Sequence, residues 1–145
     1  MVSGSADTNV CLWDTATGRL LQRLTGHSCA VTSVHIASRT VVSTGHDTSV
    51  IVWSDQGVRL LTGHHTRHVW MAATEPAAEL AVSVGADHTL RVWDIRSGAE
   101  ESTIELSDIG TACDLIRMAP DRVLIASASR DGTMELIAAT SNPRR

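Results

Sequence analysis

The stretch TLRVWDIRSG, residues 89–98, is an apolar run that ends in a Trp-Asp pair and is followed by a Gly. Two similar stretches precede it, NVCLWDTATG at residues 9–18 and SVIVWSDQG at residues 49–57. The chain has 145 residues with four Trp, no Tyr and no Phe, so a Trp that returns in the same context stands out from the composition. We therefore expect a repeated structural unit.

The repeat keeps a regular register when the units are aligned on an Asp that lies six residues before each Trp. Consecutive Asp residues are 40, 40 and 44 positions apart, and a Ser lies four residues before each of them. The fourth unit has Ile137 where the others have Trp. A spacing of this size with a Trp-Asp end is typical of four-stranded propeller blades. The aligned residues are Ser3, Asp7 and Trp13, then Ser43, Asp47 and Trp53, then Ser83, Asp87 and Trp93, and finally Ser127 and Asp131.

Within the units, short apolar runs alternate with turn residues. Residues 39–47, RTVVSTGHD, and residues 79–87, ELAVSVGAD, are apolar runs closed by Gly and Asp, which tolerate tight turns. The β-branched runs SVIVW and TLRVW follow these turns. We find no amphipathic pattern with a helical period of useful length. The sequence therefore predicts an all-β fold built from short antiparallel strands.

These features resemble the WD-repeat β-propeller family, in which a Gly-His pair opens each repeat and a Trp-Asp pair closes it about 30 residues later. Gly26-His27 precedes the second Trp, and Gly63-His64 precedes the third, with His65 an equally good choice for the His. The resemblance covers essentially the whole chain. It implies a partial WD-repeat propeller of about three and a half four-stranded antiparallel blades, in one domain of residues 1–145 with units of approximately 1–25, 26–62, 63–106 and 107–145.

The resemblance also implies a hydrogen-bonded set of His, Ser, Asp and Trp inside each complete unit. The chemistry suits these residue types, because a buried Trp N–H needs an acceptor, a Ser hydroxyl both accepts and donates, and an imidazole can join the Ser to a carboxylate. An unpaired buried group would cost roughly 1–3 kcal/mol. The implied sets are His27, Ser43, Asp47 and Trp53, then His64 (or His65), Ser83, Asp87 and Trp93, with partial sets of Ser3, Asp7 and Trp13 and of Ser127 and Asp131.

The fourth unit matches the pattern least well. Ser107-Asp108 stands where we expect the Gly-His pair, and Ile137 replaces the Trp. We expect this unit to be the least stable and to depend on apolar packing. The residues expected in that packing are Leu115, Leu124, Ile125, Leu136 and Ile137.

A Ser-His-Asp set is also the composition of a nucleophilic catalytic triad. Here the set occurs twice at a fixed spacing, which favours architecture over a single active site, and no G-x-S-x-G elbow is present. The His-rich loop with His64, His65 and His68 could hold a metal, but no Cys or carboxylate is close to it in sequence. We expect no enzyme activity, no cofactor and no metal; a propeller hydrolase that uses this loop is the least favoured hypothesis.

The same loop is the best candidate for binding a partner. It lies where the outer strand of one unit passes to the inner strand of the next, and Trp and Arg are the residues most enriched at binding hot spots. Trp70 is outside the repeated Trp position, so packing between two units is the other interpretation of it. The candidate rim consists of His46, Arg67, His68, Trp70, His88 and Arg130.

Composition narrows the class of partner. A chain with 43% hydrophobic and 19% charged residues is globular, and a net charge of −4 provides no basic field for nucleic acid or for a membrane surface. The N-terminus has no signal-peptide pattern, and three Cys without a C-x-x-C motif favour an intracellular protein, cytoplasmic or nuclear. We expect a non-catalytic scaffold or adaptor that binds other proteins or peptides. The alternative is a regulatory or ligand-sensing propeller segment of a larger multidomain protein.

The predicted blades are too few to close a propeller ring. Three hypotheses follow: the chain is a fragment or truncated form of a longer protein, it assembles with a second half-propeller, or it persists as an open arc. They differ in which surface covers the apolar faces of the terminal blades.

Trp53→Ala should lower the melting temperature much more than Ile137→Ala, because only the first change removes both a large buried side chain and its hydrogen bond. Thermal melts followed by circular dichroism compare the two variants. Equal losses would contradict the ranking.

Overall fold

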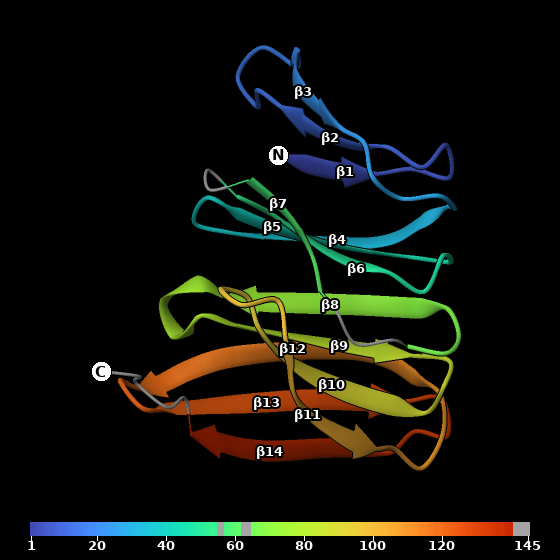
Figure 1. Ribbon diagram of the computed structural model, residues 1–145, viewed down its shortest axis with the longest axis vertical. Helices are drawn as coiled ribbons and strands as arrows, with labels where there is room; N and C mark the ends of the chain where they lie inside the picture. The colour runs from blue at the N-terminus through green and yellow to red at the C-terminus, as the bar shows by residue number, and fades with distance from the viewer. Residues whose placement is uncertain (55–56, 62–64, 141–145) are drawn as a thin grey trace.

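The computed structural model describes residues 1–54, 57–61 and 65–140, which form four antiparallel sheets (Figure 1). The sheets are stacked face to face along the longest axis, and they do not close into a ring. This confirms the predicted all-β fold and partial propeller. The sheets contain β1 (Val2–Gly4), β2 (Val10–Trp13) and β3 (Leu20–Leu24); β4 (Val31–Ala37), β5 (Thr40–Gly45), β6 (Val50–Ser54) and β7 (Gly57–Leu60); β8 (Val69–Glu75), β9 (Leu80–Gly85), β10 (Thr89–Asp94) and β11 (Glu100–Glu105); and β12 (Gly110–Ala119), β13 (Arg122–Ser129) and β14 (Met134–Thr140).

Strands within each sheet pair in the order of the sequence, and one 3-10 turn, η1 (Pro76–Ala78), joins β8 to β9. The described residues contain no helix that is long and apolar enough to cross a membrane.

The repeated Asp lies in a tight turn of each sheet. The residue directly after it has a left-handed backbone in all four turns, with φ of 75° at Thr8, 67° at Thr48, 63° at His88 and 89° at Gly132. Such a backbone is uncommon for residues other than Gly, so something else must hold it. In the first, second and fourth turns the Asp carboxylate accepts the N–H of the residue two positions further on, which closes a side-chain turn.

Three apolar layers separate the four sheets. Successive side chains of a strand point to opposite faces, so the two inner sheets contribute to the layers on both sides. This explains why β5 and β9 read as nearly continuous apolar runs rather than as alternating ones. Buried members of the layers include Val10, Val41, Ile51 and Trp53 in the first, Val42, Val52, Val69 and Trp93 in the second, and Val82, Leu90, Val123 and Ile125 in the third.

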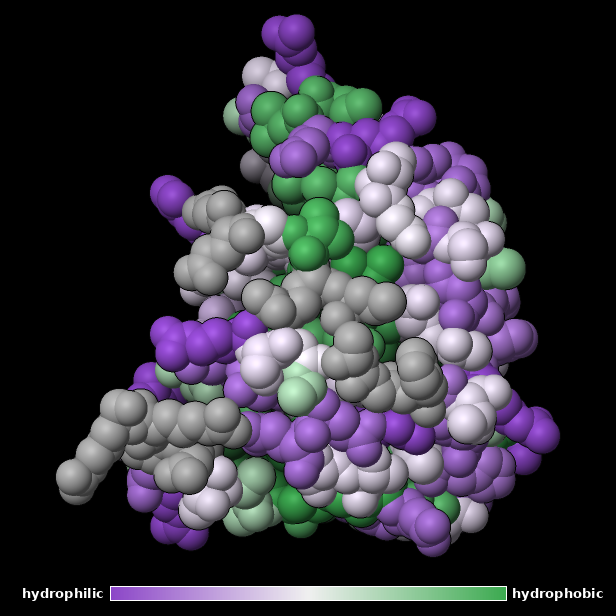
Figure 2. All heavy atoms as spheres, in the orientation of Figure 1, coloured by the Kyte–Doolittle hydropathy of each residue, from purple (hydrophilic) through white to green (hydrophobic). Residues whose placement is uncertain are grey.

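The prediction that Leu136 packs in the core of the fourth unit is wrong. Burial alternates along β14, so that Leu136 is 71% exposed while Ile137 packs against the third layer. The register pairs Leu136 with Ala126 and Ile137 with Ile125, and a one-residue difference decides which face a side chain takes. Figure 2 shows apolar atoms at this end of the stack. Leu136 is one of several large, exposed apolar residues of the fourth sheet, with Ile116, Met118 and Met134.

A continuous chain of hydrogen bonds crosses the second sheet. Trp53 Nε1 donates to Ser43 Oγ at 2.8 Å, Ser43 Oγ lies 2.8 Å from His27 Nε2, and His27 Nδ1 lies 2.9 Å from Asp47 Oδ2. A neutral His with its proton on Nδ1 satisfies every one of these atoms, since Ser43 then donates to Nε2 and Nδ1 donates to Asp47. The Ser28 N–H donates to the same carboxylate at 2.7 Å. The chain therefore joins β6 and β5 to the segment that leads into β4.

The third sheet has the same chain with His65 as its imidazole. Trp93 Nε1 donates to Ser83 Oγ at 2.8 Å, Ser83 Oγ lies 2.8 Å from His65 Nε2, and His65 Nδ1 lies 2.9 Å from Asp87 Oδ1. The sequence predicted His64, with His65 as the alternative, for the His of this set. In the structure the hydrogen bonds are made by His65. His64 lies outside the described residues.

The first sheet keeps only part of this chain of hydrogen bonds. Trp13 Nε1 donates to Ser3 Oγ at 2.8 Å, and Asp7 accepts the N–H of Asn9 in its turn. The Trp-to-Ser bond therefore forms in three sheets.

The fourth sheet replaces the chain with apolar side chains. In the second and third sheets the N–H of the residue before the repeated Asp donates to the carbonyl three positions after the His, and the fourth sheet has the equivalent bond from Arg130 to Ile109. By this frame Leu106, which is 7% exposed, takes the His position, so the prediction of Ser107-Asp108 there is wrong by two residues. Ser127 Oγ is buried without a hydrogen-bond partner among the described residues. The donor and acceptor pairs of the frame are His46 with Ala30, Ala86 with His68, and Arg130 with Ile109.

Ser127→Ala should leave the free energy of unfolding unchanged or increase it, because it removes a buried hydroxyl that has no partner. Ser43→Ala is the matched comparison, and it should cost roughly 2 kcal/mol or more, since the Trp53 and His27 nitrogens lose their shared partner. Urea unfolding measures both. A Ser127→Ala variant as unstable as Ser43→Ala would contradict the assignment.

Acid should destabilise the two complete chains. Burial alone would raise the pKa of Asp87, but the hydrogen bonds that it accepts from His65, the Thr66 N–H and the Thr89 hydroxyl outweigh burial and lower this pKa well below its ordinary value. Burial also opposes the lowering at Asp47, where the Ser28 and Ser49 N–H groups outweigh it and the pKa falls.

A carboxyl with a lowered folded-state pKa contributes stability above the unfolded value of about 3.9, and this contribution is lost as the pH falls through the folded value. Asp87→Asn should therefore be less stable than the parent near neutral pH and should lose less of its stability below about pH 4. Melting temperatures over an acid pH series measure this, with Asp121→Asn, an exposed carboxylate, as the control. Parallel pH profiles for the parent and Asp87→Asn would refute the role of Asp87.

Candidate functional site

The β5–β6 turn, the β9–β10 turn and residues 66–68 lie along one edge of the stack, at the right of Figure 1. We call this edge the turn rim. Residues 66–68 follow directly after His65 and have a fixed backbone, because the Thr66 N–H donates to Asp87 at 3.0 Å and the His68 carbonyl accepts the Ala86 N–H at 2.8 Å. The side chains of this segment are therefore presented by a well-anchored loop.

Three aromatic rings meet on the turn rim. The His46 and His68 rings are stacked, with centroids 4.3 Å apart and planes inclined by 22°. The Trp70 ring stands edge-on to both of them, at 5.6 Å from His46 and 6.1 Å from His68. Trp70 is 38% exposed, whereas Trp53 and Trp93 are 4% and 0% exposed. This aromatic cluster therefore joins the second and third sheets and still presents a large ring to solvent.

A β-bulge places Trp70 in the cluster. The register between β8 and β9 shifts between Val69 and Met71, so Trp70 is the extra residue of the bulge. The other inner strands, β4 and β12, have a bulge at the same point, with Thr32 and Thr111 as the extra residues. Those two hydroxyls make internal hydrogen bonds, to the carbonyls of Val69 and Ala128 respectively. Trp70 therefore occupies a repeated backbone position with a side chain of a different kind.

The aromatic cluster is not repeated, although its backbone frame is. The N–H that joins residue 86 to the carbonyl of residue 68 has counterparts in the second and fourth sheets, so the rim positions can be matched from sheet to sheet. The positions of His46, His68 and Trp70 are taken between the third and fourth sheets by Ala86, Ile109 and Thr111. No ring stands at any of these three. A feature that every junction between sheets shares is explained by the needs of the fold. A feature found at one junction needs a further explanation.

A hollow of about 380 Å³ lies beside the cluster, between the second and third sheets. Its lining contains no carboxylate among the described residues, and Arg67 has no hydrogen bond or ion pair there. The hollow thus combines one cation, two imidazoles and two hydroxyls. The lining residues are His46, Thr48, Thr66, Arg67, His68 and Ala86.

Comparison with known families agrees with this geometry. The family model described as WD domain, G-beta repeat, matches residues 18–54 and 56–94, which is slightly more than half of the chain. The chain belongs to the WD40 repeat family. WD40 domains typically bind other proteins and act in general as non-catalytic interaction scaffolds. A search of curated proteins found no match.

The structure brings together four of the six residues predicted for the rim of this WD40 chain: His46, Arg67, His68 and Trp70. His88 lies apart from the cluster, exposed in the β9–β10 turn. Arg130 lies on the fourth sheet, where its guanidinium pairs with Asp108 at 3.1 Å. Sequence reasoning identified the residues of the cluster but not its stacking, because contact between residues 46 and 68 depends on how two WD40 sheets pack.

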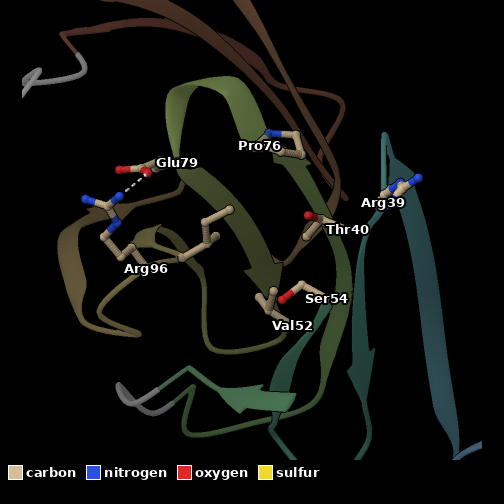
Figure 3. A pocket seen from close by; sticks show the side chains of 8 residues that line it. Arg39, Thr40, Val52, Ser54, Pro76, Glu79 and Arg96 are labelled. Carbon is tan, nitrogen blue, oxygen red and sulfur yellow. Dashed lines mark ion pairs between the residues drawn. The ribbon is translucent and has the colours of Figure 1, made fainter. Parts of the chain in front are cut away.

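A second hollow, of about 250 Å³, lies on the opposite rim between the same two sheets (Figure 3). Arg96 pairs with Glu79 at 3.3 Å on one side of it, and Thr40 and Ser54 lie on the other side. Both charged side chains are more than half exposed, so the pair is weakly held.

The described residues contain no group of three or more His, Cys, Asp or Glu side chains arranged to hold a metal ion. The three Cys are free, and burial raises the pKa of the Cys113 thiol to about 12. A thiol in that state is a small apolar side chain rather than a nucleophile.

Proposed function

We propose that this WD40 chain is a non-catalytic scaffold that holds a peptide or a protein segment on the turn rim, against the aromatic cluster of His46, His68 and Trp70. The observation that carries the proposal is that this cluster occurs at one junction of a repeated frame. The proposed contact surface is assembled before any partner arrives, because the three rings already pack on one another. A preassembled surface loses little side-chain freedom on binding.

The identity of the rings supports the same proposal. Trp combines a large apolar surface with a polar edge, and it is among the residues that contribute most at interfaces. Trp70 is 38% exposed, so part of this ring is open to a partner. The hollow beside it gives the bound segment a place for one side chain, in addition to the flat contact on the ring.

Two features argue for a non-catalytic role of the Ser-His-Asp sets. Ser43 and Ser83 are 0% exposed, so a substrate cannot reach their hydroxyls. Each hydroxyl also accepts the N–H of a buried Trp, which occupies the oxygen that would act as the nucleophile. The role of each set is to join the strands within its own sheet.

Peptides selected on the 145-residue chain from a random display library test the proposal. Binding of the selected peptides should weaken by about tenfold or more in the double variant His46→Ala/Trp70→Ala, because the variant removes the contact surface. Fluorescence anisotropy of labelled peptides measures this affinity. His88→Ala, an exposed His on the same rim outside the cluster, is the matched control and should bind like the parent.

Melting curves of both variants check that the fold survives. Peptides that bind the folded double variant as well as they bind the parent would place the binding surface elsewhere and overturn the proposal.

A further inference from the structure

Arg67 lies on the turn rim and has no ion-pair partner among the residues that the structure describes. Its position is equivalent to Asp108 of the fourth sheet, because each lies directly before the residue whose carbonyl accepts the frame hydrogen bond. The partner of Asp108 is Arg130, and the position equivalent to Arg130 is Ala86. Side chains at these two positions can therefore reach one another, as the Asp108–Arg130 distance of 3.1 Å demonstrates. In the third sheet one of the two charges is absent.

The hollow beside Arg67 is lined by groups that can donate hydrogen bonds to an anion. His46 and His68 each have a ring N–H in either protonation state, and Thr48 and Thr66 contribute hydroxyls. Ala86 leaves room on the side where the fourth sheet has a charged side chain. The lining is therefore polar and lacks a carboxylate among the described residues.

The two acidic residues of the turns on this rim, Asp47 and Asp87, pair with other groups than Arg67. The carboxylates of Asp47 and Asp87 are 5% exposed and accept hydrogen bonds from His27 and His65 respectively. Each also accepts a backbone N–H, and Arg91 adds a cation 3.8 Å from Asp87. Both carboxylates are thus already held by hydrogen bonds inside the sheets, and Asp87 also has Arg91 as a counter-charge.

We propose that this hollow binds an anionic side chain, a carboxylate or a phosphate, of the segment held on the turn rim, with Arg67 as its ion-pair partner. The bound anion takes the place that Arg130 occupies relative to Asp108, with the signs exchanged. The inference rests on the proposed function, since it assigns the chemistry of one side chain of the same bound segment. An Arg guanidinium suits either anion, because its planar fork donates two parallel hydrogen bonds.

Peptides selected on the parent chain test the charge. The selected sequences should be enriched in Asp or Glu at one position. Replacing that residue with Gln in the synthetic peptide should weaken binding about five- to tenfold, and raising the salt concentration should shrink this difference. Arg67→Gln should weaken binding of the acidic peptide by a similar factor and should leave the affinity for the Gln peptide unchanged. Arg130→Gln changes the net charge equally on the same rim, and it is the matched control.

A peptide with phosphoserine at the same position separates the two sources of the anion. Tighter binding than the Glu peptide assigns the hollow to phosphate, and equal or weaker binding assigns it to carboxylate. Peptides that need Trp70 but show less than about a twofold response to both the Gln peptide and Arg67→Gln would overturn this inference and leave the proposed function intact. If no selected peptide depends on Trp70 or His46, the proposed function fails, and this inference fails with it.

Discussion

The second and third sheets each depend on the hydrogen bonds made by the hydroxyl of one buried Ser. Ser43 and Ser83 each accept the N–H of a buried Trp and lie 2.8 Å from a His nitrogen, so one oxygen joins the third strand of the sheet to the loop before its first strand. The His passes the connection to an Asp that also fixes a tight turn. Each member is buried because its neighbour satisfies it, and the loss of the Ser or of the His leaves two other members without that partner.

The same chain positions the turn rim. His65 is anchored at both ring nitrogens, and the next three residues follow it under two further backbone hydrogen bonds. His68 and the bulge that carries Trp70 are therefore held at a fixed distance from the second sheet, where His46 lies next to its own anchored Asp47. The stacking of two imidazoles from different sheets depends on this anchoring. Structural hydrogen bonds inside the sheets thus preorganise a surface that they do not themselves form.

The spacing of Ser, Asp and Trp predicted the repeated four-stranded unit, because a period of 40 residues is visible whatever lies between the repeated residues. The resemblance to the WD-repeat family then implied both complete hydrogen-bonded sets. It could not separate His64 from His65, since the choice depends on the path of a loop over one residue. The sequence also did not predict that Leu106 takes the His position of the fourth sheet, because a position without its polar residue no longer shows the repeat pattern. The face of Leu136 depended on the register of β14, which the consecutive apolar residues 136–139 left undetermined.

Repetition gives the molecule an internal comparison that a single-unit fold lacks. A residue that recurs at the same backbone position in several sheets is explained by what every sheet needs, as with the Asp of each turn. A residue that occurs once at such a position needs another explanation, because the equivalent sheets stand without it. Trp70 replaces a Thr whose hydroxyl binds internally, and Arg67 stands where Asp108 has a partner. Both exceptions fall on one rim and at one junction, and both replace a satisfied polar side chain with one that has capacity left for an outside group.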